Sequence, residues 1–548
     1  MEATMVISHG SAVQLSLAFK GCSTGNNNSS PTNYSSTRLC NISVRALQNK
    51  PILRNATVGL SSTNSPGGLF MTVDYKSLRG CPMRRQRTGI EVRASVATEQ
   101  LTGSEDGDSG NTERGGTETG VVIVGAGLAG LAAARQCAQD GIPFLLVEGS
   151  DGVGGRVRTD SYQGFLLDRG FQIFITAYPE AQKVLDYEAL NLQTFYAGAL
   201  VWFNGAFHRV ADPIRHFTDG LGSLFNPIGS AIDKVIVGIV RIRAAVKPVD
   251  EILSSEETTI LSRLKSEGFS EAMVDRFFRP FFGGIFFDRE LQTTSRLFEF
   301  VFKCLALGSN TLPAAGIGAI PQQMADKLPQ GSVLLNSRVA KLEKDDKGVT
   351  SGVVLENGRG ISAKYGVVVA TEGPEAARLL GEKLPTTPSV EKPPRSTTCL
   401  YFSADSSPVN EPILLLNGTK NGIINNMFFP TTVAPSYAPA GKTLVSVSLL
   451  GLHENTSDSE LEGTVRAELR SWFGPQLVDS WQHLRTYRIS LAQPYQAPPT
   501  MLLKNPRVEQ GLYVCGDHRY SSTFDAALVS GRRAVEELLA DCKMTSSK

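Results

Sequence analysis

Three glycines are spaced so that they could hold an anion against the start of a helix. Gly125, Gly127 and Gly130 follow the apolar run Val121–Val124 and precede the stretch LAAARQCAQDG, whose composition is helical. In such a loop the first glycine permits a tight turn, the second lets the backbone approach a pyrophosphate, and the third permits close helix–strand packing. The free N–H groups and the dipole of a helix N-terminus favour bound phosphate. The spacing therefore predicts a phosphate-binding loop.

A carboxylate follows at the spacing of a dinucleotide site. The next apolar run, IPFLLVE, ends at Glu148, whose oxygens can accept hydrogen bonds from ribose hydroxyls. An acid at this position disfavours a 2′-phosphate, and therefore NADP. Strand, loop, helix and acid together predict dinucleotide binding, with Ala126, Leu128 and Ala129 carrying the backbone around the phosphates.

A second glycine-rich stretch begins directly after this acid. It contains Gly149, Gly154, Gly155 and Arg156. Here the sequence resembles the flavin amine oxidase / phytoene desaturase superfamily. The resemblance implies that this loop follows the pyrophosphate of FAD and that Arg156 offsets phosphate charge. The alternative is a surface turn with a solvated arginine.

Two further segments extend the resemblance toward the flavin and the adenine. The stretch GFLLDRGFQ contains Gly170 and Phe171, which the resemblance places beneath the isoalloxazine ring. The stretch SRVAKLEKDDKGVTSGVVLENG is predicted to form β-hairpins, and the strand GVVVAT should join the same sheet. In the family, the backbone at the position of Val339 lies against adenine.

The C-terminal part of the chain matches the family as well. The apolar run GLYVCGD ends in Gly516 and Asp517, and Ala526 and Ala527 open a helix. The resemblance implies that Asp517 binds the ribityl or pyrophosphate part of FAD and that the helix directs its N-terminus at the flavin. A simple NAD enzyme has no use for this element. No cysteine matches the covalent-flavin pattern, so we expect FAD to be held non-covalently.

The resemblance covers about 121–541 and implies an α/β fold. In this fold an FAD-binding, Rossmann-like domain of the GR2 type is built from discontinuous segments, and an α+β substrate domain is inserted. We expect the FAD-binding domain in 120–190, 321–380 and 485–541, and the substrate domain in 191–320 and 381–484.

The N-terminal region has the composition of a targeting sequence. Between Met1 and Arg93 eleven Lys or Arg face three acids, and Ser, Thr and Asn are frequent. Such a leader is typical of organelle import, so we interpret 1–94 as a chloroplast transit peptide, with mitochondrial import as the alternative, and 95–119 as a flexible linker. The mature protein would act in the stroma or peripherally on plastid membranes.

The middle of the chain, roughly 176–325, is expected to be largely helical and to form the substrate side. The aromatic run Phe277–Phe287 could wall an apolar channel or pack between helices. In the family, the segment matching Leu312–Pro321 borders the substrate cavity. Leu221–Val246 could be a membrane-facing helix or a core helix with basic ends. Thr523 occupies the position where amine oxidases carry a cage tyrosine.

These features favour an FAD-dependent enzyme that desaturates or isomerises an apolar, carotenoid- or isoprenoid-like plastid compound by hydride transfer to flavin N5. The electron acceptor would be a quinone or oxygen. One alternative is an amine or protoporphyrinogen oxidase that uses oxygen, for which Arg276, Arg279 and Arg289 could meet propionates. Another is a non-catalytic prenyl-binding relative, resembling GDP-dissociation inhibitors.

Metal and nucleic-acid chemistry find no support in the sequence. The histidines show no metal-ligand spacing and no CxxC occurs, so we expect no metal. The formal net charge of +1 gives no reason to expect a nucleic-acid partner. No residue can be assigned as catalytic, because no nucleophile–base pair is evident.

Overall fold

The computed structural model describes residues 117–212, 215–216, 226–381 and 393–546, and three short strands nearer the N-terminus. The chain divides into two units, Met1–Asp108 and Ser109–Lys548. In the first unit, β1 (Thr4–Val6), β2 (Ala12–Ser16) and β3 (Ile42–Arg45) form an antiparallel sheet. The rest of the expected transit peptide over 1–94, and most of the expected linker, lie outside the described residues.

The second unit begins with a strand that starts earlier than the sequence indicated. β4 (Thr117–Val124) enters the range 95–119 that we expected to be linker. The reason is backbone pairing, because Thr117–Thr119 pair with Ile361–Ala363 of β16. Residues Val121–Val124 are fully or almost fully buried, as expected for a parallel strand covered on both faces.

The larger sheet has eight strands in the order β13-β5-β4-β16-β15-β14, with β23 beside β16 and β22 beside β23. β13, β5, β4, β16 and β23 run parallel, whereas β14 and β15 form the expected antiparallel hairpin. The remaining strands of this sheet are β5 (Phe144–Val147), β13 (Val333–Leu334), β14 (Val339–Lys344), β15 (Thr350–Leu355), β16 (Gly360–Val369), β22 (Arg507–Glu509) and β23 (Leu512–Val514).

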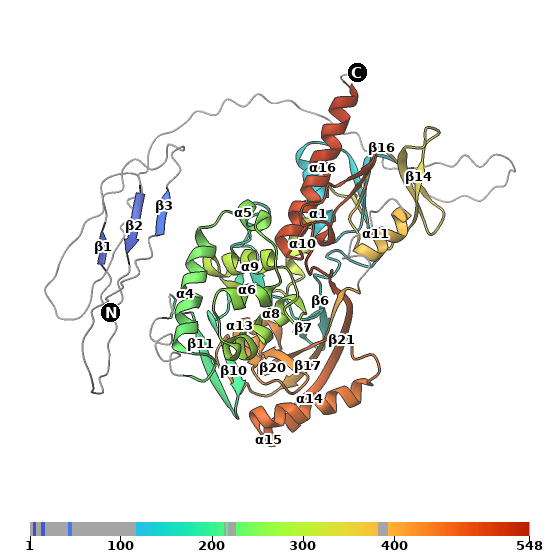
Figure 1. Ribbon diagram of the computed structural model, residues 1–548. Helices are drawn as coiled ribbons and strands as arrows, with labels where there is room; N and C mark the ends of the chain where they lie inside the picture. The colour runs from blue at the N-terminus through green and yellow to red at the C-terminus, as the bar shows by residue number, and fades with distance from the viewer. Residues whose placement is uncertain are drawn as a thin grey trace, which may run out of the picture. The chain divides into compact units, whose positions relative to one another are not determined.

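Helices from both ends of the folded chain pack together on this sheet. α1 (Leu128–Gln139) lies against α16 (Phe524–Ser546), as Figure 1 shows. A Cβ at Gly531 would lie 1.9 Å from the carbonyl oxygen of Ala129, so only glycine permits this approach. The nucleotide-type domain is therefore built from discontinuous segments, as predicted. α10 (Ala319–Ala325) and α11 (Gly373–Leu380) complete it.

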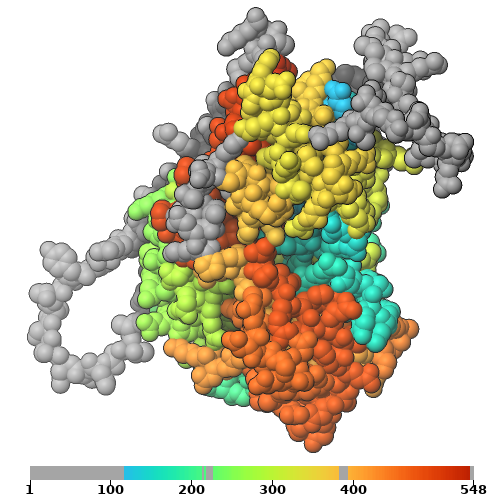
Figure 2. Space-filling model, turned by 90° about the vertical axis from the view of Figure 1, so that its right-hand side faces the viewer, coloured from blue at the N-terminus to red at the C-terminus, as the bar shows by residue number. Residues whose placement is uncertain are grey.

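A second sheet has seven strands in the order β11-β10-β18-β19-β20-β17-β21. One face packs against α14 (Asp458–Phe473) and α15 (Pro475–Ser480), and the other faces β7 and the helical region. Figure 2 shows α14 and β21 in orange below the yellow β14–β15 hairpin. The strands are β10 (Gly198–Phe203), β11 (Ala206–Ala211), β17 (Arg395–Ala404), β18 (Leu414–Asn417), β19 (Ile424–Phe428), β20 (Thr443–Leu450) and β21 (Gln482–Gln493).

The middle of the chain is less helical than expected, because β10 and β11 fall within 176–325 and join the seven-stranded sheet. α4 (Ala231–Val246) begins ten residues after Leu221, where Ser230 caps it with Asp233; 221–225 lie outside the described residues. The helices that follow are α5 (Val249–Ser254), α6 (Ile260–Ser266), α7 (Glu271–Met273), a π-helical turn (Val274–Phe278), α8 (Arg279–Phe286) and α9 (Ser295–Leu307).

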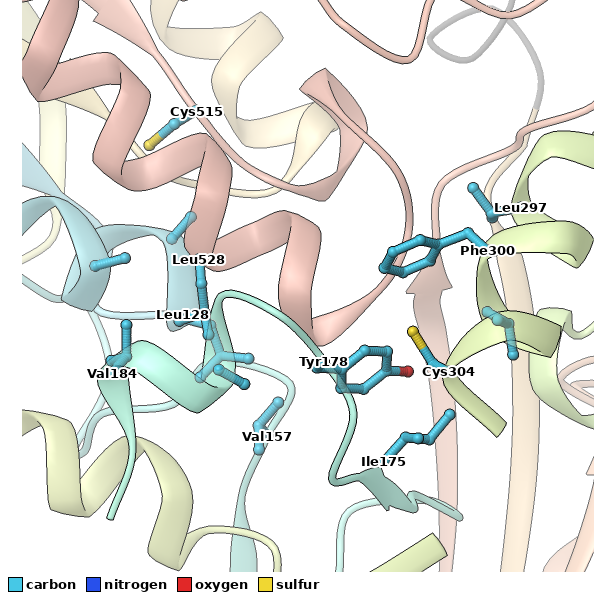
Figure 3. Packing of buried hydrophobic residues seen from close by; sticks show 14 of the residues in the cluster. Leu128, Val157, Ile175, Tyr178, Val184, Leu297, Phe300, Cys304, Cys515 and Leu528 are labelled. Carbon is cyan, nitrogen blue, oxygen red and sulfur yellow. The ribbon is translucent and has the colours of Figure 1, made fainter. Parts of the chain in front are cut away.

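Short elements connect the two sheets. Tyr178, which follows β8, stacks on Phe300 of α9 and lies beside Cys304, whereas Leu128 and Leu528 meet between α1 and α16 (Figure 3). One hydrophobic core therefore joins the nucleotide-type domain to the helical region. The connecting elements are β6 (Thr159–Tyr162), β7 (Phe165–Asp168), β8 (Phe174–Ile175), α2 (Ala181–Val184), β9 (Leu192–Thr194), β12 (Asn310–Pro313) and α13 (Pro430–Val433).

Candidate active site

Three parallel strands of the larger sheet end at the same edge. Val124 of β4 pairs with Val369 of β16, and Val369 pairs with Val514 of β23. The segments that leave these strands must therefore lie together, although they come from distant parts of the chain. Ligands of open α/β sheets bind outside the carboxyl ends of the strands.

The first glycine loop has the geometry that its sequence predicted. Gly125 has a φ of +100°, a region that favours glycine, and its N–H donates to the carbonyl of Val147 at 2.7 Å. A Cβ at Gly130 would lie 1.8 Å from the carbonyl oxygen of Gly125, so glycine is required there for packing. At Gly127 a Cβ would meet no atom within 4 Å. Gly127 therefore faces open space that a ligand can use.

Glu148 fixes the ends of this loop. One carboxylate oxygen accepts the N–H of Ala126 at 2.7 Å, and the other accepts the N–H and hydroxyl of Ser150 at 2.9 and 2.8 Å. Carboxylate oxygens can accept further hydrogen bonds, so Glu148 remains able to receive ribose hydroxyls. The side chain lines the cavity described below.

The second glycine loop lies directly on the first. The N–H of Gly154 donates to the carbonyl of Ala126 at 2.8 Å, and Gly127 and Gly154 form an isolated parallel bridge. A Cβ at Gly155 would approach only Gly127, at 3.4 Å. If these glycines carried side chains, those side chains would occupy the space between the two loops and the adjoining cavity.

Arg156 and Asp517 close this end of the site. Their charged atoms lie 2.8 Å apart, and Arg156 also donates to the carbonyl of Ala492 at 3.0 Å. Burial alone would raise the pKa of Asp517, but the charge and hydrogen bond of Arg156 lower it below its usual value. Arg156 was expected to offset phosphate charge, whereas in the structure its charge is balanced by Asp517.

The sequence reasoning missed two residues at the end of β16. Thr371 and Glu372 line the cavity directly after the strand GVVVA. The hydroxyl of Thr371 is buried and has no hydrogen-bond partner among the described residues. Burial raises the pKa of Glu372 above its usual value. Their position at the carboxyl end of a parallel strand was the signal that could have identified them.

A cavity of about 620 Å³ runs from these loops to the helical region. Its volume is in the range of cofactor and ligand sites. Ala126, Gly130 and Ala526 do not line it but belong to the supporting frame. The predicted residues that do line it are Gly125, Gly127, Leu128, Ala129, Glu148, Gly149, Gly154, Gly155, Arg156, Gly170, Phe171, Val339, Gly516, Asp517 and Ala527.

The other half of the cavity, which we call the apolar half, is lined mainly by hydrocarbon and aromatic side chains. Arg158 and Arg169 also line the cavity, but they pair with Asp151 and Asp160. The apolar half comprises Phe171, Ile173, Ile175, Tyr178, Phe195, Pro280, Phe281, Ile285, Phe286, Phe287, Val301, Leu305, Leu414 and Ile489.

The aromatic run of α8 serves both of the purposes that the sequence left open. Phe278, Phe282 and Phe286 stack along one side at centroid distances of 6.0 and 6.1 Å and are buried in the core, and Phe286 also reaches the cavity. Phe281 and Ile285, four residues apart on the adjacent side, line the cavity. One short helix thus both anchors the helical region and walls the cavity.

The segment Leu312–Pro321 does not border the cavity, contrary to the expectation from the resemblance. It packs behind the second glycine loop instead, because a Cβ at Gly154 would lie 2.9 Å from Pro321. Thr523 does line the cavity, and its hydroxyl accepts the N–H of Ala526 at 3.1 Å.

Helix α16 reaches the cavity with its first turn. Ala527 lines the cavity, whereas the carboxylate of Asp525 turns away and accepts the N–H of Glu180 at 2.6 Å. Burial raises the pKa of Asp525 to about 6. The helix start is thus tied to the segment that leads into α2.

The residues present fit a flavin dinucleotide. The space at this strand edge is suited to phosphates and hydroxyls. It is surrounded by two glycine-rich loops, by the buried Asp517 and by the unpartnered hydroxyl of Thr371. An elongated cavity continues from there into an apolar compartment. The fold and site therefore define a dinucleotide-binding flavoprotein.

Comparison with known proteins identifies the family. The profile of the family described as flavin containing amine oxidoreductase matches residues 128–539, and the chain belongs to this family. It is therefore a flavin-dependent oxidoreductase with FAD as its cofactor.

Individual relatives are distant. The chain is 20% identical over 476 residues to 15-cis-phytoene desaturase of Arabidopsis thaliana, covering 78% of this chain and 81% of that protein. It is 38% identical to coproporphyrinogen III oxidase of Propionibacterium freudenreichii over 78 residues, which span only 15% of that protein. An oxidoreductase structure from Methanosarcina mazei superposes with a TM-score of 0.59 at 19% identity, covering 77% of this chain and all of that one.

Proposed function

We propose that the chain desaturates or isomerises an apolar, isoprenoid-like compound bound in the apolar half of the cavity. The observation that carries this proposal is the lining itself. The acidic residues of the cavity, Glu148, Glu372, Glu375 and Asp517, all belong to segments of the nucleotide-type domain. A hydrocarbon chain would replace water against aromatic and aliphatic side chains, which is favourable in proportion to the area covered.

FAD, when bound, supplies a hydride acceptor at N5. A desaturation would remove a hydride from one carbon and a proton from its neighbour to form a C=C bond, with FAD as the hydride acceptor and a quinone or oxygen as the final electron acceptor. The chain's own contribution is to orient the hydrocarbon against Phe171, Phe281 and Ile285, which line the cavity, and to exclude water.

A cationic amine is a poorer fit. An ammonium group needs a carboxylate or an aromatic cage, and Thr523 stands where the cage tyrosine would be. Arg276 contacts the ring of Phe203, and Arg279 pairs with Asp275 at 2.9 Å. Neither these arginines nor Arg289 line the cavity as described. The three arginines that were expected to meet porphyrin propionates therefore lie outside the cavity lining.

We further propose that FAD is held non-covalently. The described free cysteines are Cys137, Cys304, Cys399, Cys515 and Cys542, and none of them lines the cavity. A covalent link would require a reactive side chain within reach of the flavin.

Helix α4 supports a peripheral membrane contact. It lies at the outer side of the helical region and packs on α9 (Figure 1). Its outer side carries aliphatic side chains that are 46–71% exposed: Ile232, Val235, Ile239, Ile242 and Val246. An exposed aliphatic helix face suits the surface of a bilayer. Among the described residues, no helix is long and apolar enough to span a membrane.

We place the protein in the plastid, in the stroma or on plastid membranes. The composition of the leader supports this localisation, and the phytoene desaturases to which the chain is similar are described as chloroplastic or chromoplastic. An apolar substrate would be drawn from the membrane surface to which α4 binds.

The proposal is tested by mixing the FAD-loaded full chain anaerobically with an isoprenoid fraction of plastid lipids, and separately with spermine or a porphyrinogen. We expect only the isoprenoid fraction to yield product, either two hydrogens lighter with bleaching of the flavin absorption, or of equal mass with altered chromatographic retention. Turnover of spermine or porphyrinogen without any isoprenoid product would contradict the proposal.

A further inference from the structure

Two adjacent amide side chains lie between the seven-stranded sheet and α8. β19 pairs Ile424 with Leu449 and Asn426 with Ser448, so the register shifts between Ile424 and Asn426. A bulge of this kind re-aims side chains that would otherwise alternate between the two faces. Asn425 and Asn426 both contact the α8 segment as a result.

Gly284 of α8 makes room for these amides. A Cβ at Gly284 would lie 2.9 Å from Nδ2 of Asn425 and 3.0 Å from Oδ1 of Asn426. Glycine is unfavourable inside a helix because it loses more backbone freedom than other residues. Gly284 is nevertheless buried within α8. The chain thus keeps a helix-weakening residue at the place where the amides require space.

The hydrogen bonds fix the orientation of both amides. Nδ2 of Asn425 donates to the carbonyl of Pro280 at 2.9 Å and to Oδ1 of Asn426 at 2.9 Å. A backbone carbonyl can only accept, so the nitrogen of Asn425 must face Pro280. The oxygen of Asn426 must then face Asn425, which leaves Nδ2 of Asn426 as the remaining donor.

This remaining donor is buried at the cavity. Asn426 is 1% exposed and lines the cavity, and its Nδ2 has no hydrogen-bond partner within the described part of the chain. A buried donor without an acceptor costs free energy, and native proteins rarely leave one unsatisfied. The side chains of Phe281, Ile285 and Leu414, which also line the cavity, offer no acceptor. Ser448 lies opposite Asn426 in the sheet, and its buried hydroxyl is likewise without a hydrogen-bond partner among the described residues.

We infer that Nδ2 of Asn426 donates a hydrogen bond to an oxygen of the substrate. The inference rests on the proposed function and narrows its substrate class from apolar compounds in general to those that carry a carbonyl or ether oxygen. The rest of such a molecule lies against the aromatic wall. Asn426 is thereby a specificity-determining residue, since a pure hydrocarbon would leave its donor unpaired.

The test compares two probes of the same shape on the FAD-loaded full chain. One is β-ionone, an isoprenoid ketone, and the other is its analogue in which a methylene group replaces the carbonyl oxygen. Dissociation constants are measured by equilibrium dialysis and by the change in flavin absorption. We expect the chain to bind the ketone roughly tenfold more tightly than the methylene analogue, the ratio of one neutral hydrogen bond.

Variants assign this preference to Asn426. Asn426→Leu and Asn426→Ala should bind both probes with similar dissociation constants and retain FAD. The control is Ser448→Ala, which removes the buried, unpartnered hydroxyl opposite Asn426 in the sheet and does not line the cavity. This variant should keep the preference, because the proposed acceptor belongs to the substrate and not to Ser448.

Equal binding of the two probes by the unaltered chain would overturn the inference, because an enclosed water would then satisfy the amide. A ketone preference that survives in both Asn426 variants would overturn it as well. If the FAD-loaded chain binds neither probe, the proposed apolar site itself fails, which is a different result from loss of the ketone preference alone.

Discussion

The guanidinium of Arg156 and the carboxylate of Asp517 lie 2.8 Å apart, although one follows the first strand pair of the folded unit and the other precedes its last helix. This contact joins the glycine loops to the C-terminal strand at the edge where we propose that FAD binds. Removing Asp517 would leave the half-buried guanidinium of Arg156 without its partner.

We therefore expect Asp517→Ala to weaken FAD binding by at least tenfold, measured as flavin retained per chain during dialysis. The matched control is Asp541→Ala, which removes a carboxylate 2.8 Å from Arg507 outside the cavity and should leave flavin retention unchanged. Equal flavin retention in the two variants would show that Asp517 does not hold the cofactor.

In the first glycine loop, Gly127 faces open space that a ligand can use, whereas Gly130 packs against the chain itself. Gly127→Ala should fold with an unchanged melting temperature without FAD but bind FAD at least tenfold more weakly, because its Cβ enters open cavity space. Gly130→Ala should destabilise the folded chain itself by several kcal/mol, since its Cβ overlaps the carbonyl of Gly125. Gly238→Ala in α4, where a Cβ meets nothing within 4 Å, is the control and should not lower stability. Thermal unfolding with and without FAD distinguishes these outcomes.

The two sides of α8 should respond differently to the same substitution. Phe282→Ala opens a void in the core and should cost about 3–5 kcal/mol of unfolding free energy in denaturant titrations. Phe281→Ala should cost less stability but raise the dissociation constant of β-ionone roughly tenfold, because its ring lines the cavity. Unchanged probe affinity in Phe281→Ala would contradict the location of the apolar half.

Asp168 lies at the interface between β7 and the seven-stranded sheet and should make the free energy of unfolding depend on pH. Burial raises its pKa to about 6, and it accepts hydrogen bonds from Thr159 at 2.6 Å and Tyr437 at 2.9 Å. Between about pH 4 and 6 the unfolded chain loses this proton while the folded chain keeps it, so stability falls as the pH rises.

Relative to Asp168→Asn, the unfolding free energy of the unaltered chain should therefore decrease by about 3 kcal/mol from pH 4 to 6 and stay level above that range. Chemical denaturation of both proteins across this pH range provides the measurement. A difference that is independent of pH, or that grows with pH, would refute the raised pKa.

Membrane binding through α4 is tested by flotation with vesicles of galactolipid and phosphatidylglycerol. The double variant Ile239→Glu and Ile242→Glu should lose most of the bound fraction, because it places charge on the exposed aliphatic face. Met501→Glu, which replaces an apolar side chain that is 70% exposed on another segment, should float like the unaltered chain. Flotation of the double variant at the unaltered level would exclude α4 as the contact.

The sequence predicted the parts of the fold that have a strict local requirement. The spacing of Gly125, Gly127 and Gly130 is readable because each glycine meets a steric need that no other residue satisfies. The apolar run over Val121–Val124 is readable because both faces of the strand are covered. The strand within GVVVAT was recognised in the same way, from its continuous apolar run.

The sequence did not predict which distant segments of the chain pair with one another. The polar residues Thr117–Thr119 are held by backbone pairing with β16 and by a hydrogen bond from Arg359 to the hydroxyl of Thr117, which side-chain patterns do not reveal. The partner of Arg156 depends on where β23 ends, and the unpartnered amide of Asn426 depends on a bulge and on two glycines of another helix. Such features emerge only when distant segments meet.

The most direct measurement of this account is the electron density of FAD in crystals of the loaded chain. The account predicts the pyrophosphate between Gly127 and Gly155, the ribityl chain beside Asp517, and the flavin ring at Gly170 with one face open to Phe281 and Ile285. Density that places the ring outside this cavity, or that leaves Asp517 without contact to the cofactor, would contradict it.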